Sequence, residues 1–128
     1  MRVFKTRAFG GFQRRERISD VSLAEAVRRA ERGLVDADLG GGVIKQRMAR
    51  PGQGRSGGFR VLIAYRARAR SVFLFGFAKK ERANVNAAEL ATAREIAKGF
   101  LEADAGALAR ALAAGGLEEV DYDEEEEN

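Results

Sequence analysis

Two apolar runs separated by a short basic connection constrain the fold of this chain more than any other feature. Residues 59–66 read FRVLIAYR and residues 71–77 read SVFLFGF, and both are rich in β-branched and aromatic side chains. Runs of this length and composition favour strands over helices. The sequence Arg-Ala-Arg-Ala-Arg at 66–70 then predicts a hairpin connection. We therefore expect two antiparallel strands at the centre of a sheet.

Weaker patterns place the remaining elements around this hairpin. A Ser22-x-x-Glu25 capping box precedes apolar residues at helical spacing, and Asn86 and Asp104 are candidate N-caps for two later helices. Residues 36–42 end in three glycines and are expected to form a loop. We expect further strands at 3–5 and 43–48, and helices at 8–17, 22–33, 86–101 and 104–115.

This order predicts an α+β fold: a small, antiparallel-rich sheet with the helices packed on one side. The length of 128 residues suits one domain, which we assign to residues 1–116. Residues 117–128 contain eight acidic side chains and are expected to form a loosely held acidic tail.

The chain contains no cysteine and no histidine. This excludes disulfides, thiolate or imidazole metal sites, cysteine nucleophiles and a Ser–His relay. The carboxylates form no compact cluster in the sequence, so we expect neither a metal nor a cofactor. No apolar run approaches the length of a membrane span, and the charged N-terminus is unlike a secretory signal. A cytoplasmic protein without a membrane partner is expected.

Charge is distributed very unevenly along the chain. Residues 1–82 contain 20 Lys and Arg against 7 Asp and Glu, whereas residues 83–128 contain 3 against 12. Within residues 43–82 there are 11 basic residues and one acid, Glu81. Such a block is typical of a surface that binds a polyanion, most plausibly nucleic acid, although a solvated basic surface without a ligand has the same composition.

The cations fall at positions that suggest one cleft. Strand alternation places Lys45 and Arg47 on the same face. Arg60 interrupts an apolar strand, and residues 43–80 contain no acid that could pair with it locally. Because an isolated buried charge is costly, we expect Arg60 to bind an anion in a cleft. The Lys79-Lys80-Glu81-Arg82 cluster follows the next strand and can join it, while the neighbouring phenylalanines are expected in the core.

The stretch KQRMARPGQGRSGGFRVLIAY, followed by FLFGFAKKERANV and the helix at 86–101, resembles the RelE/HigB-like toxins of bacterial type II toxin–antitoxin systems. The glycine turn matches the subfamily signature R-x-G-x-G-[KR]-S-G-G-[FY]-R, and the similarity spans nearly the whole chain. The resemblance implies a microbial-RNase-like RelE fold that cleaves messenger RNA, typically in the ribosomal A site. It also implies a cognate antitoxin, expected to be of the helix-turn-helix type, and operator DNA as a partner of the toxin–antitoxin complex.

Carried over residue by residue, the resemblance implies a catalytic set without a metal. Arg60 and Arg82 are suited to the phosphate because guanidinium groups bind it bidentately. Lys45 is the candidate base, since crowding by neighbouring arginines disfavours its protonated form, and Lys80 is the candidate acid. Asn86 stands where the best-known members have a tyrosine. The full expected set is Lys45, Arg47, Arg60, Lys80 and Arg82 for catalysis, and Arg50, Arg55, Lys79 and Asn86 for RNA binding.

Two other functions remain open at this point. The related ParE branch shares the fold and poisons DNA gyrase by binding, although the cluster of Lys45, Arg47 and Arg60 argues against a pure binder. A catalytically silent RNA- or DNA-binding protein is favoured only by Asn86.

Overall fold

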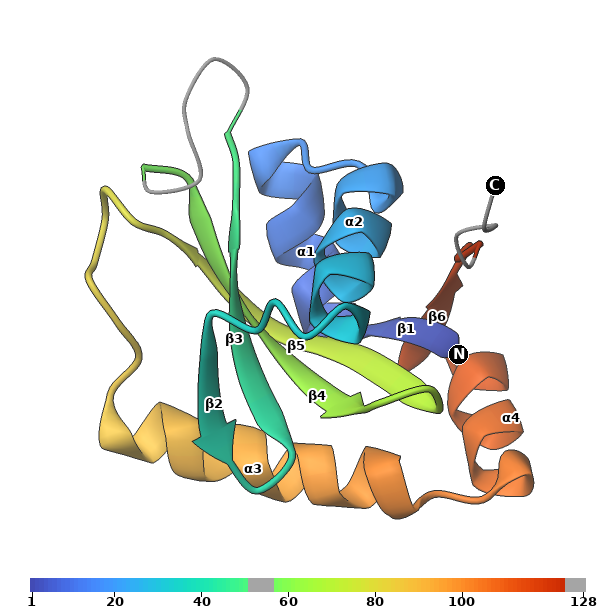
Figure 1. Ribbon diagram of the computed structural model, residues 1–128. Coiled ribbons are helices and arrows are strands. Elements are labelled where there is room, and N and C mark those ends of the chain that lie inside the picture. The colour runs from blue at the N-terminus through green and yellow to red at the C-terminus, as the bar shows by residue number, and fades with distance from the viewer. Residues whose placement is uncertain (51–56, 124–128) are drawn as a thin grey trace.

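A computed structural model describes residues 1–50 and 57–123, and these form one sheet with four helices (Figure 1). Arg55 and most of the glycine turn lie outside the described residues. In chain order the elements are β1 (Arg2–Thr6), α1 (Arg7–Glu16), α2 (Asp20–Glu31), β2 (Ala37–Gly40), β3 (Val43–Met48), β4 (Phe59–Arg66), β5 (Arg70–Ala78), α3 (Ala87–Glu102), α4 (Ala105–Ala113) and β6 (Leu117–Val120).

The sheet has six strands in the order β2-β3-β4-β5-β1-β6. The predicted hairpin is confirmed, because β4 and β5 pair antiparallel at its centre. Every other neighbouring pair is also antiparallel, except β1 and β5, which run parallel. The α+β class and the antiparallel-rich sheet are therefore confirmed.

The helices cover both faces of the sheet, whereas the sequence led us to expect them on one side. Val61 and Ile63 of β4 pack with the helices α1 and α2. Leu62 and Ala64, which point the other way, pack with α3 and α4. A strand that is apolar on both faces needs cover on both, so the helices divide between an α1/α2 face and an α3 face (Figure 1).

Two predicted boundaries are wrong. The N-cap of α2 is Ser19, whose hydroxyl accepts a hydrogen bond from the Ser22 backbone N–H at 3.2 Å, so the Ser22–Glu25 capping box is not formed. The helix therefore begins at Asp20, whose carboxylate accepts a hydrogen bond from the Lys5 ammonium at 3.0 Å. The expected loop at 36–42 contains β2, which pairs with β3. Its three glycines, 40–42, all have positive φ, which permits the tight turn between these strands.

The expected acidic tail also begins with a strand. Residues Leu117–Val120 form β6 against β1, and Leu117 and Val120 are buried, with 1% and 2% of their surface exposed. Without β6, β1 would present unpaired backbone groups at a sheet edge. Arg2 and Lys5 of β1 pair with Glu119 and Glu118 on β6, so the acidic residues at this point belong to the folded unit.

The two later helices begin where the sequence predicts. Asn86 caps α3 and, with Glu89, forms a full capping box, while Asp104 caps α4. Arg70 at the start of β5 donates to the carbonyls of Phe100 and Ala103, which ties the central hairpin to the end of α3. In the part of the chain that the structure describes, no helix is both long enough and apolar enough to cross a membrane.

Candidate functional site

Two rows of side chains cross β3, β4 and β5 on the α3 face. In the first row Arg47 lies opposite Arg60, and Arg60 lies opposite Phe77. In the second row Lys45 lies opposite Leu62, which lies opposite Phe75. Neighbouring strands are about 4.8 Å apart and successive residues on one face about 7 Å apart. The two rows therefore fit within a patch about 10 Å wide.

An irregularity in the pairing of β4 and β5 brings Phe75 and Phe77, the β5 residues of the two rows, to this face. Leu62 pairs with Phe75 while the next residue, Ile63, pairs with Phe73, so β5 carries one extra residue. Phe73 packs on the α1/α2 face. Strict alternation would send Phe75 and Phe77 to that face as well, but the extra residue turns both rings to the α3 face. Phe73 and Phe77 are buried, as the sequence predicts, but Phe77 and the half-buried Phe75 also border the cations.

Arg60 is a buried arginine beside another arginine. Its exposed fraction is 8%, and its Nη1 donates to the Phe59 carbonyl oxygen at 3.3 Å. Burial lowers the pKa of the Arg60 guanidinium, and the charge of Arg47 lowers it further, while Asp36 opposes both effects. Burial and the neighbouring Arg47 thus disfavour the charged form of Arg60, and an anion bound beside it would favour that form.

Arg82 lies over Phe75 and Phe77, the β5 residues of the two rows. Its guanidinium carbon is 5.1 Å from the ring centroids of both Phe75 and Phe77. The same guanidinium forms two hydrogen bonds with Glu89, from Nη1 to Oε1 at 3.0 Å and from Nη2 to Oε2 at 2.8 Å. Arg82 is thus fixed in orientation between two aromatic rings and the first turn of α3.

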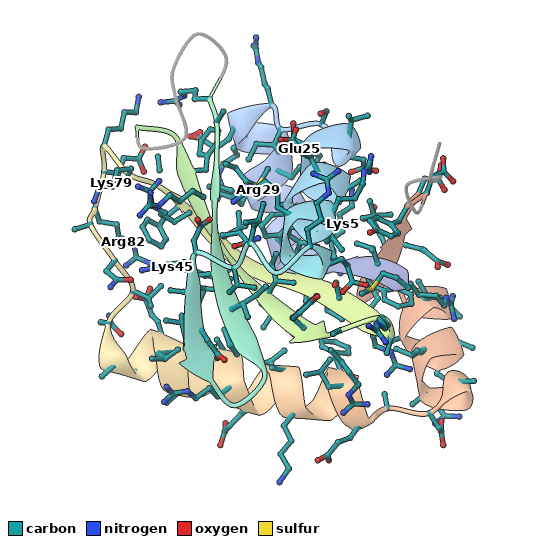
Figure 2. All side chains as sticks on the ribbon, viewed as in Figure 1. Lys5, Glu25, Arg29, Lys45, Lys79 and Arg82 are labelled. Atoms are coloured by element: carbon teal, nitrogen blue, oxygen red, sulfur yellow. The ribbon has the colours of Figure 1, made fainter. Side chains whose placement is uncertain are left out.

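The segment between β5 and α3 also reaches β3. The Lys45 Nζ and the Asn84 Oδ1 are 3.4 Å apart, which brings this segment beside the second row. Figure 2 shows Lys45, Lys79 and Arg82 on the side of the molecule where the chain passes from β5 to α3. We call Lys45, Arg47, Arg60 and Arg82 the cationic cluster. Its size and charge suit a phosphodiester group.

Other predicted site residues lie apart from this cluster. Arg50 stacks over Phe59, a residue of the α1/α2 face, and pairs with Glu16 of α1, with Arg50 Nη2 and Glu16 Oε1 3.4 Å apart. The Asn86 side chain is used in capping α3. Lys79 and Lys80 are exposed at the turn after β5, and neither forms an ion pair within residues 1–50 and 57–123.

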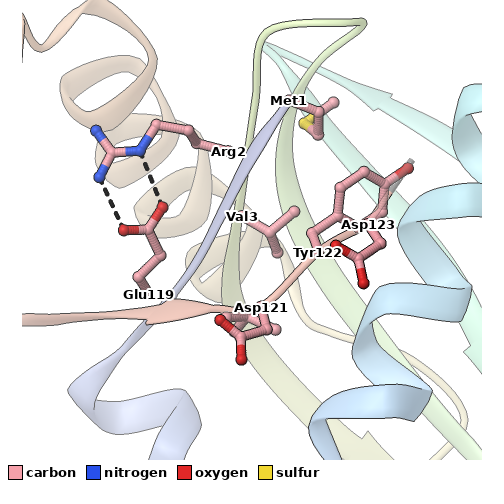
Figure 3. A pocket seen from close by; sticks show the side chains of 8 residues that line it. Met1, Arg2, Val3, Glu119, Asp121, Tyr122 and Asp123 are labelled. Carbon is pink, nitrogen blue, oxygen red and sulfur yellow. Dashed lines mark hydrogen bonds and ion pairs between the residues drawn. The ribbon is translucent and has the colours of Figure 1, made fainter.

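Among the described residues there is no candidate metal-binding cluster, and a cavity lies beside β1 and β6. Within the described residues, no three His, Cys, Asp or Glu side chains lie close enough together to hold a metal ion. A cavity of about 470 Å³ lies between β1 and the end of β6, beside the Arg2–Glu119 ion pair (Figure 3). It contains none of the residues predicted for the site.

Comparison with known proteins identifies the family of the chain. The model of the RelE toxin of the RelE/RelB toxin–antitoxin system matches residues 1–120. The chain belongs to this RelE toxin family. This RelE-family protein is accordingly the toxin of a toxin–antitoxin system, with an antitoxin as its partner. A comparison with curated proteins gave no match.

Two residues of the candidate site were not found from the sequence. Asn84 lies in an irregular segment, and no sequence pattern indicates that its amide reaches Lys45. Glu89 could have been found, because Asn86-x-x-Glu89 has the spacing of a capping box. The sequence gives no indication, however, that the same carboxylate also binds Arg82.

Proposed function

We propose that this RelE-family toxin is an endoribonuclease that cleaves messenger RNA on the ribosome and thereby stops translation. The observation that carries the proposal is the position of Arg60 directly opposite Arg47 in the register of β3 and β4. Arg82 stacks over Phe77, which lies opposite Arg60 on β5. Guanidinium groups gathered on one face attract a polyanion such as RNA, and Asp36 and Glu89 offset only part of their charge. The RelE match favours this function over the gyrase-poisoning alternative.

The proposed reaction uses the nucleophile that RNA itself carries. The ribose 2′-hydroxyl attacks the adjacent phosphorus, and the bond from phosphorus to the 5′-oxygen breaks. The products are a 2′,3′-cyclic phosphate and a 5′-hydroxyl, so atoms and electrons balance without a cofactor. Such a step needs removal of the 2′-proton, stabilisation of charge on the phosphoryl oxygens, and protonation of the leaving oxygen.

The cluster contains side chains suited to each of these tasks. Lys45 would take the 2′-proton, and Asn84 would hold its side chain in place through the 3.4 Å contact. Arg60 and Arg82 would bind the phosphoryl oxygens, because guanidinium groups stay charged and donate in pairs. Arg47 would add positive charge beside Arg60. Lys80, exposed on the turn after β5, would deliver the proton to the 5′-oxygen.

The wider surroundings of the reaction are part of the same proposal. Arg55, Lys79 and Asn86 would contact flanking RNA, and Arg50 would do so from the α1/α2 face. The antitoxin would be of helix-turn-helix type and would bring the complex to operator DNA in the cytoplasm.

Substitution of Arg60 tests the assignment. Loss of one donor to a developing oxyanion typically lowers the rate about 10²–10³-fold, so we expect Arg60→Ala to lose that much single-turnover cleavage of mRNA on programmed ribosomes. Because Arg60 is buried, Arg60→Lys serves as a second variant. It keeps the positive charge and most of the side-chain volume but lacks the paired N–H donors of the guanidinium. Arg110→Ala, on α4, is the charge-matched control, and circular dichroism checks the fold.

The same cleavage assay tests Lys45 as the general base, and growth experiments test the gyrase-poisoning alternative. Lys45→Arg should be as inactive as Lys45→Ala, because arginine stays protonated at working pH. A folded Arg60→Ala protein that cleaves at the wild-type rate would sink the nuclease assignment. Growth arrest with intact mRNA and inhibited gyrase would support the gyrase-poisoning alternative instead.

A further inference from the structure

The carboxylate of Glu89 is held at the edge of the cationic cluster by two sets of bonds. Its Oε1 accepts from the Asn86 backbone N–H at 2.9 Å, within the capping box of α3. Both of its oxygens accept from Arg82, at 3.0 and 2.8 Å. The Arg82 hydrogen bonds hold the pKa of Glu89 below its ordinary value, with help from the Asn86 N–H. Glu89 is therefore ionised at neutral pH.

Arg82 depends on this carboxylate for its place in the site. The arginine belongs to an irregular segment between β5 and α3, and its side-chain exposure is 36%. A long, half-exposed side chain of this kind loses considerable rotamer freedom when it is fixed. The rings of Phe75 and Phe77 hold its flat face, while Glu89 sets its rotation in that plane. The two bonds to Glu89 use two of the five N–H groups of the guanidinium, which leaves three for another acceptor.

We propose that Glu89 is a positioning residue for the nuclease: it fixes the Arg82 guanidinium over Phe75 and Phe77, in the orientation that receives the phosphate, and offsets one positive charge of the cluster. This inference rests on the proposed function, and it assigns a role to a residue that never touches RNA. The carboxylate thus has two opposing effects. It orients a donor needed in the transition state, and it weakens the general attraction of the cluster for RNA.

Glu89→Gln separates these effects. The amide oxygen can still accept from Asn86 and from one Arg82 nitrogen, so the cap remains while the negative charge is lost. We expect kcat on programmed ribosomes to fall about tenfold to a hundredfold through loss of orientation. Binding to single-stranded RNA should become tighter at low salt, with a log–log salt slope steeper by about 0.7 for one added phosphate contact. Glu102→Gln, at the far end of α3, is the matched control and should change neither quantity.

A double-mutant cycle then distinguishes positioning from a merely structural role. If Glu89 acts through Arg82, Glu89→Gln should not lower kcat further in an Arg82→Ala background. Equal losses in both backgrounds, together with a lowered melting temperature, would show that Glu89 only caps α3 and would overturn the inference. Wild-type kcat and salt slope for Glu89→Gln, alongside an inactive Arg60→Ala, would overturn this inference alone. Wild-type cleavage by Arg60→Ala would overturn the proposed function itself.

Discussion

Gln46 is a buried polar side chain that supports the cationic cluster from the opposite face of β3. Its exposed fraction is 0%, yet each of its polar atoms is bonded. Its Oε1 accepts from the Asp36 backbone N–H, and its Nε2 donates to the carbonyls of Ala26 and Leu34. A buried amide that is fully bonded fixes its surroundings strongly. The segment after α2 is thereby fixed against β3, the strand that carries Lys45 and Arg47.

Tyr65 is a second residue whose single polar atom matters. Its hydroxyl donates to the Glu31 carboxylate, which also accepts from the Arg68 backbone N–H. Burial raises the pKa of Tyr65 above its ordinary value, and the hydrogen bond and negative charge of Glu31 raise it further. The native protein therefore keeps this proton at pH values where the unfolded chain, with a pKa of about 10, has released it.

The sign of the resulting pH dependence follows from proton linkage. Above pH 10 the unfolded state binds fewer protons, so this stabilisation is complete below pH 10 and is lost as pH rises further. We expect Tyr65→Phe to be less stable than the wild type by about 1 kcal/mol at pH 8. This difference should narrow between pH 10 and 11 in urea unfolding experiments. A constant difference across that range would contradict the raised pKa.

At the scale of elements, α1 packs on β5 through a glycine. A Cβ added at Gly76 would lie 2.7 Å from Phe12 Cδ2, closer than side chains tolerate. Phe12 in turn contacts Phe9 and Phe59, with ring centroids 5.7 and 5.8 Å away. Gly76 therefore lets an aromatic ring of α1 reach the strand backbone beside the extra residue of β5.

We expect Gly76→Ala to push Phe12 away and to destabilise the protein by about 1–3 kcal/mol, as overpacked cores do. Thermal unfolding measures this loss. Gly99→Ala is the matched control, because a Cβ at Gly99, on α3, meets no atom within 4 Å. Alanine also favours a helix interior, so the control should be neutral or stabilising. Equal melting temperatures for Gly76→Ala and the wild type would show that Phe12 has room to move.

At the scale of the whole molecule, β6 is the last strand of the described chain and forms one edge of the sheet. It runs antiparallel to β1, which runs parallel to β5. Since β5 leads toward the cationic cluster, β6 leads away from it. The described residues after β6 continue along the α1/α2 face, where Tyr122 packs and where Figure 3 shows it near Val3. The acidic end of the described chain therefore leaves the sheet on the side away from the cluster.

A pair of truncations tests where the folded unit ends. Removal of residues 124–128 should leave the melting temperature unchanged. Removal from Leu117 onward exposes the β1 edge and loses two buried side chains, each contributing about 1.5–3 kcal/mol. At roughly 3–6 °C per kcal/mol for a domain of this size, we expect the melting temperature to fall by about 10 °C or more. The double variant Leu117→Ala/Val120→Ala in the full chain should reproduce most of this loss. Equal melting temperatures for the two truncations would show that β6 does not contribute to the stability of the folded unit.

Local patterns in the sequence determined the central hairpin, the caps at Asn86 and Asp104, and the shared face of Lys45 and Arg47. Each of these depends on residues a few positions apart, where strand alternation and capping chemistry operate. The same alternation placed Arg60 and Tyr65 on opposite faces, as the packing of the two residues confirms.

Tertiary structure alone decided the features that make these residues a candidate site. The extra residue in β5 turned Phe75 and Phe77 toward the cations, and strand register, not sequence spacing, set Arg47 opposite Arg60. Arg50, close to these residues in sequence, went to the other face with Glu16. Glu89 reached Arg82 because α3 begins beside the end of β5. Register and packing depend on many distant contacts at once, and no local pattern contains that information.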